Sequence, residues 1–263
     1  MSDNSQALPT ASKVPEVRAM EMGDVVFALR AGWRDFRRKP MMGLFFSIIY
    51  VAGGWLIYTF LVVTEQIWYA LPLTAGFPLL APFLAVGLYE VSHRLEQGDT
   101  DFHRNDIFGV VWRQRLRQLP LMSWVIIVYF LFWSFFAHML FAMFLGPSVL
   151  INLSAGYAYL LQPEGMMLLA VGTAFGAVFA FVLFCLTVIS LPLLLDKELD
   201  FVTAMLTSIA VVKANPRVMI VWAAVLAGLT FLAMLPALLG LFIALPVLGH
   251  ASWHIYRRAL QHD

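Results

Sequence analysis

The residues best suited to chemistry in this sequence are two histidines near its end, in the stretch GHASWHIYRR. His250 and His254 lie four residues apart, so a helix would carry both imidazoles on one face. Glu90 and His93 form a second pair with E-x-x-H spacing, which also shares a helix face. Imidazole and carboxylate groups are ligands of Zn, Fe and Cu. If the two helices are neighbours, these four residues are candidate ligands of a metal ion or members of a proton-linked site.

Two other interpretations of these groups remain open. Haem ligation would need histidines at a common membrane depth on both faces of the haem. His138 lies 18 residues after Pro120, about 27 Å along a helix, and so at a very different depth from His250. Haem is therefore less favoured as a cofactor than a metal ion. The simplest interpretation places the histidines in an aromatic belt at the membrane surface, beside Trp253 and Tyr256.

The composition is that of a polytopic membrane protein. Of 263 residues, 61% are hydrophobic and 13% are charged, whereas soluble domains have about 25% charged residues. The formal net charge is +1, and no basic patch indicates a nucleic-acid surface. The single cysteine, Cys185, lies in an apolar run and has no partner for a disulfide. No phosphate-binding loop or nucleophile elbow is present, so the sequence predicts an all-α membrane protein without an evident catalytic site.

Six stretches are long and apolar enough to cross a bilayer, which needs about 20 residues per helix. The last apolar stretch has 37 residues, about 55 Å as a single helix, so Pro236 is expected to divide it into two spans. The predicted spans are 41–63, 67–89, 119–144, 166–191, 218–235 and 237–253.

The positive charges indicate how these spans are threaded. All 17 Lys and Arg residues fall before the first span, between the second and third, between the fourth and fifth, or after the sixth. Positive residues accumulate in cytoplasmic segments, so both termini are expected in the cytoplasm. A five-span chain would instead place Arg257 and Arg258 outside. Residues 1–23 are expected to form a disordered leader, and 24–260 a single integral membrane domain.

Each cytoplasmic segment ends in an amphipathic stretch, a proline and then a span. The three copies are ALRAGWRDFRRKP, GVVWRQRLRQLP and AMLTSIAVVKANP. Proline is tolerated at a helix start and disfavours helix in the residue before it, so each copy predicts an interfacial helix, a break and a new helix. The pattern divides the domain into three hairpin units, at about 24–95, 104–196 and 200–260.

The interfacial helices carry aromatic and basic residues suited to a lipid surface. Trp33, Trp112 and Trp253 are expected at the membrane interface or in helix packing. The arginines expected at lipid headgroups are Arg34, Arg37, Arg38, Arg113, Arg115, Arg117, Arg257 and Arg258. Docking of a cytoplasmic partner on these basic faces is the alternative. Gly172 and Gly176 form a small-xxx-small motif that predicts close helix packing, either within the chain or in a homodimer.

The stretches ALRAGWRDFRRKP, PFLAVGLYEVSHRLEQGD and LPVLGHASWHIYRR resemble the signatures of an uncharacterised family of bacterial inner-membrane proteins, a domain of unknown function. The resemblance covers about residues 24–260; it implies a bacterial protein with six spans. Carried over to this chain, the family's motif positions are Gly32, Trp33, Asp35, Gly87, Tyr89, Glu90, Gly249, His250, Trp253, His254 and Tyr256. The family would have arginine at His93, which weakens a metal site that needs His93. Some relatives bear names that suggest a cytochrome oxidase subunit.

The sequence therefore favours a non-catalytic inner-membrane protein that is an accessory or assembly partner of a larger membrane complex, such as a respiratory one. A small-molecule transporter is one alternative, which the repeat and the proline-containing second and sixth spans would suit. A metal- or haem-binding protein that uses Glu90, His250 and His254 is another. The lipid bilayer is the partner that all three interpretations share.

Overall fold

The computed structural model of the chain describes residues 13–64, 76–145 and 162–261. Regular structure within these ranges is helical, apart from a single antiparallel bridge between Val17 and Leu260. The helices are α1 (Met22–Arg38), α2 (Pro40–Thr64), α4 (Gly76–Glu96), α5 (Arg104–Gln114), α6 (Leu119–Leu145), α8 (Pro163–Thr187), α9 (Ser190–Asp196), α10 (Phe201–Ala214), α11 (Pro216–Met234) and α12 (Leu241–Ala259).

Helix breaks lie where the repeated prolines predict them. α1 ends at Arg38 and α2 begins at Pro40, while α10 ends at Ala214 and α11 begins at Pro216. A turn over 115–118 separates α5 from α6. A proline in the first turn loses no hydrogen bond, because the first N–H groups of a helix have no partner within it.

Among the described residues, four helical segments are long and apolar enough to cross a membrane. They are Pro40–Thr64, Leu119–Leu145, Pro163–Asp196 and Pro216–Met234. These segments correspond to the first, third, fourth and fifth predicted spans. α4 and α12 do not meet the same criterion, since both end in polar residues and α12 carries the histidine motif. The predicted second span lies partly outside the described residues.

Two helix ends differ from the sequence prediction. The fourth apolar segment is interrupted after Thr187, and the short helix α9 follows from Ser190. The last helix begins at Leu241 instead of position 237, because Ala237 and Leu238 adopt φ values of 51° and 67° in the turn after α11. Left-handed backbone of this kind is uncommon for residues other than glycine and ends a helix.

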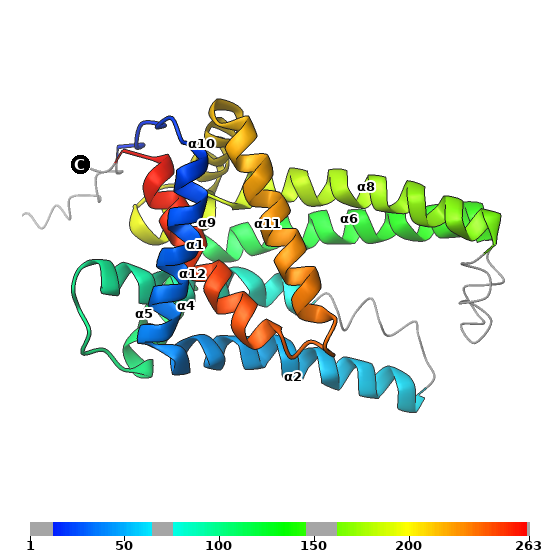
Figure 1. Ribbon diagram of the computed structural model, residues 1–263, viewed down its shortest axis with the longest axis horizontal. Coiled ribbons are helices and arrows are strands. Elements are labelled where there is room, and N and C mark those ends of the chain that lie inside the picture. The colour runs from blue at the N-terminus through cyan, green and yellow to red at the C-terminus, as the bar shows by residue number, and fades with distance from the viewer. Residues whose placement is uncertain (1–12, 65–75, 146–161, 262–263) are drawn as a thin grey trace, which may run out of the picture.

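Figure 1 shows α6 and α8 side by side as one long hairpin, with α2 running in a similar direction along another edge of the molecule. α1 and α12 pack against each other and cross this direction. α12 occupies the centre of the polar end, where it contacts α1, α2, α4, α9 and α11.

The two ends of the described chain are bonded to each other. The N–H of Arg18 donates to the carbonyl of Ala259 at 2.9 Å, and the N–H of Gln261 donates to the carbonyl of Glu16 at 2.9 Å. The side chain of Asn215, between α10 and α11, accepts from the N–H of Met20 at 2.7 Å. Part of the predicted leader is thus held against the C-terminal end of α12.

Candidate functional site

Glycines let the helices around α12 approach closely. A Cβ added at Gly32 of α1 would lie 2.5 Å from the carbonyl oxygen of Val247 and 2.7 Å from the nitrogen of Ala251. Both atoms belong to the backbone of α12 and cannot move aside cheaply. A Cβ at Gly249 would similarly lie 2.6 Å from the Leu88 side chain of α4. These glycines of the motifs therefore allow α1, α4 and α12 to pack closely. The polar residues of the three helices can then contact each other.

A buried carboxylate–imidazole pair joins α1 to α12. Nε2 of His254 lies 2.7 Å from Oδ2 of Asp35, and these residues are only 7% and 2% exposed. The ring of Phe27 meets His254 edge-on, with centroids 6.2 Å apart. Burial by itself raises the pKa of Asp35, but the hydrogen bond and charge of His254 outweigh it and hold the pKa below its ordinary value, with a smaller contribution from Ser92. Asp35 is therefore ionised at neutral pH and accepts from His254.

The second histidine extends this polar network into the core. Nδ1 of His250 lies 2.9 Å from the hydroxyl of Ser92 and 3.1 Å from the carbonyl oxygen of Leu88. Ser92 also contributes to the lowered pKa of Asp35, so it lies near the Asp35–His254 pair as well as His250. His250 is fully buried, and its Nε2 has no hydrogen-bond partner among the described residues.

The aromatic residues of the C-terminal motif lie inside the protein, where the sequence suggested a belt at the membrane surface. Trp253 and Tyr256 are both fully buried. The indole N–H of Trp253 donates to Glu96 at the end of α4 at 3.0 Å, and Glu96 also accepts from Arg257 at 3.1 Å. The hydroxyl of Tyr256 donates to Asp196 of α9 at 2.6 Å. These carboxylates satisfy the polar ends of the rings, which removes the need for water or headgroups.

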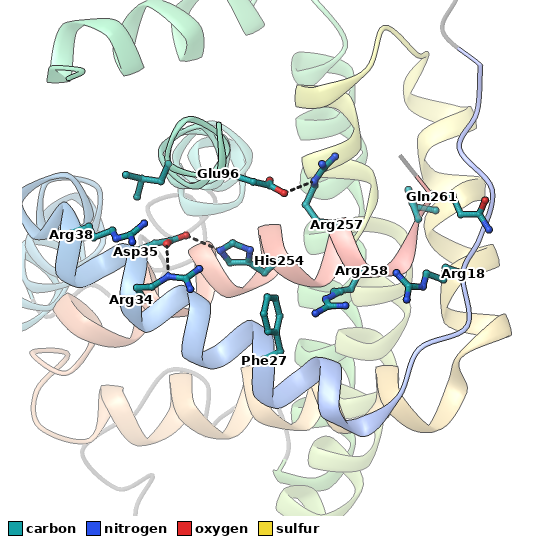
Figure 2. A pocket seen from close by; sticks show the side chains of 12 residues that line it. Arg18, Phe27, Arg34, Asp35, Arg38, Glu96, His254, Arg257, Arg258 and Gln261 are labelled. Atoms are coloured by element: carbon teal, nitrogen blue, oxygen red, sulfur yellow. Dashed lines mark hydrogen bonds and ion pairs between the residues drawn. The ribbon is translucent and has the colours of Figure 1, made fainter. Parts of the chain in front are cut away.

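A charged cavity of about 670 Å³ opens beside the Asp35–His254 pair. We call it the arginine cavity, and Figure 2 shows its side chains around the opening. Five arginines face two carboxylates in its wall. The lining residues are Arg18, Phe27, Arg34, Asp35, Arg38, Leu95, Glu96, His254, Arg257, Arg258, Leu260 and Gln261.

The four predicted metal ligands are divided between two places. Glu90 accepts from Nε of Arg94 at 2.7 Å and lies 3.6 Å from Nδ1 of His93. His250 and His254 belong to the network around Asp35 instead. Within the described ranges, no three His, Cys, Asp or Glu side chains are grouped as a metal ion would need. Metal or haem binding remains a prediction that the contacts do not favour.

Sequence reasoning singled out Asp35 only through the family resemblance and gave no role to Ser92. Neither residue forms a recognisable spacing with the histidines, because the contacts come from three different helices. One signal was available. An acidic residue stands alone inside the basic stretch WRDFRR.

The predicted interface residues have mixed surroundings. Trp33 and Trp112 are 46% and 63% exposed, and the guanidinium of Arg115 lies 3.3 Å from the centre of the Trp112 ring. Arg117 instead forms an ion pair with Glu198. The arginines that line the cavity are Arg34, Arg38, Arg257 and Arg258, in addition to Arg18.

The small-xxx-small motif of α8 does not lie at a close helix contact within the described chain. A Cβ added at Gly172 would meet no atom within 4 Å, and one at Gly176 would lie 3.8 Å from Trp133. Both glycines border an apolar groove between α6 and α8.

Comparison with known proteins finds a family for the middle of the chain. Residues 70–196, which include α4, α5, α6, α8 and α9, match a family of predicted integral membrane proteins, DUF2189, whose function is unknown. The match includes the motif around Glu90 but ends before the C-terminal histidine motif. No curated protein and no solved structure matches the chain. The resemblance to an uncharacterised membrane-protein family is thus confirmed over residues 70–196, which are similar to the predicted integral membrane proteins of the DUF2189 family.

Proposed function

We propose that the protein is a non-catalytic accessory or assembly partner of a larger complex in the bacterial inner membrane. The observation that carries this proposal is the hairpin of α6 and α8, which runs away from the centre of the molecule and whose far end reaches beyond the other described helices (Figure 1). Apart from each other, α6 and α8 contact mainly α4, α9 and α10. The sides of the hairpin are therefore available to another membrane protein.

Aromatic contacts hold the two helices of the hairpin against each other. Trp133 stacks on Phe179 with centroids 6.1 Å apart, and Phe136 stacks on Phe175 at 6.0 Å. The hydroxyl of Tyr129 donates to the carbonyl of Phe179 at 2.8 Å. Such ring pairs contribute about 0.5–1.5 kcal/mol each beyond their buried area. The hairpin can therefore keep its shape while a partner covers its sides.

The surface of the hairpin suits a helix of another membrane protein. A groove of about 360 Å³ between α6 and α8 is lined by aromatic and aliphatic side chains and includes Gly172 and Gly176. Small residues allow helices to approach closely in a membrane, where packing drives association. The exposed apolar residues on these two helices include Trp124, Val128, Phe132, Phe135, Met139, Phe175, Val178 and Phe181.

A structural use of the polar residues supports a non-catalytic role. Asp35 and His254 join α1 to α12, and Glu96 joins α4 to Trp253 and Arg257. These polar side chains form hydrogen bonds with each other inside the chain. Residues that connect helices in this way are suited to a rigid scaffold.

The proposal includes six spans with both termini in the cytoplasm, arranged in three units. The bonds from Arg18 to Ala259 and from Gln261 to Glu16 support an even number of crossings, because they hold the two ends of the described chain together. Contacts of Glu96 with Trp253 and Arg257 support crossings by α4 and α12, because both helices return to the end where α1 lies. The distribution of Lys and Arg supports a cytoplasmic location for that end.

Photo-crosslinking in native membranes tests the proposed partner. A benzophenone amino acid is placed at Phe135 of α6 or Val178 of α8, which are 65% and 62% exposed. The matched control places it at Leu56 of α2, which is 71% exposed. We expect a discrete protein adduct from the two hairpin positions and none from Leu56, with the adduct identified by mass spectrometry. Adducts with lipid alone would contradict the proposal, and adducts with a second copy of the chain would replace it with a homo-oligomer.

A further inference from the structure

The wall of the arginine cavity carries more arginines than carboxylates, so its positive charge is only partly neutralised. Asp35 is bonded to His254, and Glu96 accepts from Trp253 and Arg257. The carboxylates in the wall are thus already engaged. A negatively charged group in the cavity would meet the remaining guanidinium groups without displacing these bonds.

Three arginines in the wall keep their donors available. Arg18 and Arg38 form no ion pair within the part of the chain that the structure describes. Nε of Arg34 lies 3.8 Å from Oδ1 of Asp35, and its side chain is 54% exposed. A guanidinium presents its N–H groups in a planar fork that matches the oxygens of a phosphate or carboxylate.

The rest of the cavity wall is held in place. The guanidinium of Arg258 lies 4.2 Å from the centre of the Phe27 ring and 3.7 Å from Asp24. The strand-like segment that carries Arg18 is fixed by the side chain of Asn215, which donates to the carbonyl of Arg18 at 3.0 Å. A wall held in this way needs little reordering when a ligand enters, which favours binding.

The size of the cavity favours an organic anion over an inorganic ion. Its volume of about 670 Å³ falls within the range of sites for small organic ligands, about 300–1,000 Å³. Leu95 and Leu260 contribute apolar surface beside the arginines. A ligand with both a charged group and an organic part would match this combination.

The orientation of α1 separates the cavity from the lipid-facing side. Met22, Val26 and Trp33 are exposed and form one apolar stripe along the helix. Arg34 and Arg38 line the cavity and lie about 120° around the helix axis from this stripe, at 3.6 residues per turn. If the stripe faces the bilayer, the cavity opens toward water.

Arg30 and Arg37 occupy the intermediate positions on α1. Both are exposed, and neither lines the cavity. They therefore lie between the apolar stripe and the cavity, where a lipid headgroup would meet them first. The basic residues of α1 thus divide into a pair beside the lipid and a pair in the cavity.

We propose that the arginine cavity binds a soluble organic phosphate with at least two negative charges, held by Arg34, Arg38 and Arg18. This inference does not depend on the accessory role proposed above, since it concerns the opposite part of the molecule from the α6–α8 hairpin.

Calorimetric titration of the full-length protein tests the site. The protein is placed in nanodiscs of phosphatidylcholine, and ADP and pyrophosphate are the probes, with adenosine as the uncharged control. We expect ADP and pyrophosphate to bind and adenosine to give no signal. The double variant Arg34→Gln/Arg38→Gln should weaken binding at least tenfold, because it removes two charge-assisted contacts. Raising the salt concentration should weaken binding as well.

The matched control is Arg30→Gln/Arg37→Gln, which makes the same change of charge on the same helix outside the cavity. Its affinity should stay within twofold of wild type. The proposal would be overturned if both double variants weakened the affinity for ADP and pyrophosphate equally. It would also be overturned if neither ADP nor pyrophosphate bound to the folded wild type. All four arginines of α1 are exposed, so an unchanged unfolding temperature is expected and checks that each variant is folded.

A second set of nanodiscs distinguishes a soluble phosphate from a lipid headgroup. Phosphatidylglycerol is added to the bilayer, and the ADP titration is repeated. An unchanged affinity supports a soluble ligand. A loss of ADP binding that depends on Arg34 and Arg38 would assign the cavity to a lipid headgroup and overturn the soluble ligand.

Discussion

Asp35 and His254 are 219 residues apart in the sequence, yet their side chains meet at 2.7 Å. The pair is buried between α1 and α12 and lines the arginine cavity. One helix was expected to lie on the membrane surface and the other to cross it. The pair therefore connects a helix near the start of the described chain with a helix near its end.

Replacing Asp35 tests what this pair contributes to stability. Asp35→Asn removes the charge and leaves His254 with a weaker buried partner, so the free energy of unfolding should fall by about 1–3 kcal/mol. Thermal unfolding of the purified protein in detergent measures the effect. Asp101→Asn, at an exposed position between α4 and α5, is the control and should stay within about 0.5 kcal/mol. Equal unfolding temperatures for wild type and Asp35→Asn would show that the pair does not stabilise the fold.

The same pair predicts a direction for pH dependence. The pKa of Asp35 is lowered in the folded protein, against about 3.9 in an unfolded chain. The folded state therefore binds fewer protons at this site, and the stabilisation is fully present above the unfolded pKa. It should be lost as the pH falls through the lowered folded pKa. The difference in stability between wild type and Asp35→Asn should accordingly narrow as the pH falls below about 4. A difference that does not narrow in this acidic range would contradict the assignment.

Two glycines with different surroundings should respond differently to the same substitution. Gly32→Ala places a methyl group 2.5 Å from the backbone of α12 and should cost about 1–3 kcal/mol through overpacking. Gly172→Ala meets no atom within 4 Å and should be neutral or stabilise its helix by up to about 1 kcal/mol. Unfolding temperatures of the two variants in detergent give the comparison. If Gly32→Ala is tolerated as well as Gly172→Ala, α1 and α12 are not packed at this distance.

Cysteine labelling tests the six-span arrangement. In a Cys185→Ser background, Asp101→Cys and Glu198→Cys should be protected from an impermeant maleimide in intact cells, because both lie on the predicted cytoplasmic side. Ser154→Cys, between the third and fourth predicted spans, should be labelled. All three should react after the membrane is permeabilised. Labelling of Asp101→Cys in intact cells would reverse the proposed orientation.

Metal analysis tests the alternative interpretation, in which His250 and His254 bind a metal ion. Plasma mass spectrometry of the purified protein measures bound Fe, Cu and Zn, with His250→Ala/His254→Ala as the comparison. We expect no stoichiometric metal in the wild type, because His254 already contacts Asp35 and His250 contacts Ser92. Near-stoichiometric metal that the double variant loses would make these residues ligands and require a rearrangement of the network.

The helix boundaries around α1, α2, α10 and α11 were predictable because they depend on local properties. Pro40 and Pro216 each begin a helix after a short break, and this follows from the proline ring alone. The long apolar runs of α2 and α6 were equally readable from composition. The turn at Ala237 and Leu238 was not predictable in detail. Its left-handed backbone is formed by residues other than glycine or asparagine, which are the types that predict this conformation.

The site was only partly predictable, because side-chain environments depend on which helices are neighbours. His250 and His254 were chosen for their shared face, but the partner expected for them was Glu90. Glu90 instead pairs within α4, with Arg94. The partner observed for His254 is Asp35, which comes from the far end of the sequence.

The sequence by itself determined the class of protein and the ends of several helices, because hydrophobicity and proline act over one or two turns of chain. Only the tertiary structure decided that Trp253 is buried against Glu96, and that Arg34 and Arg38 face a cavity while Arg30 and Arg37 do not. These outcomes depend on the position of α1 against α12. That position is set by contacts such as the fit of Gly32 against the backbone of α12, between residues more than two hundred positions apart in the chain.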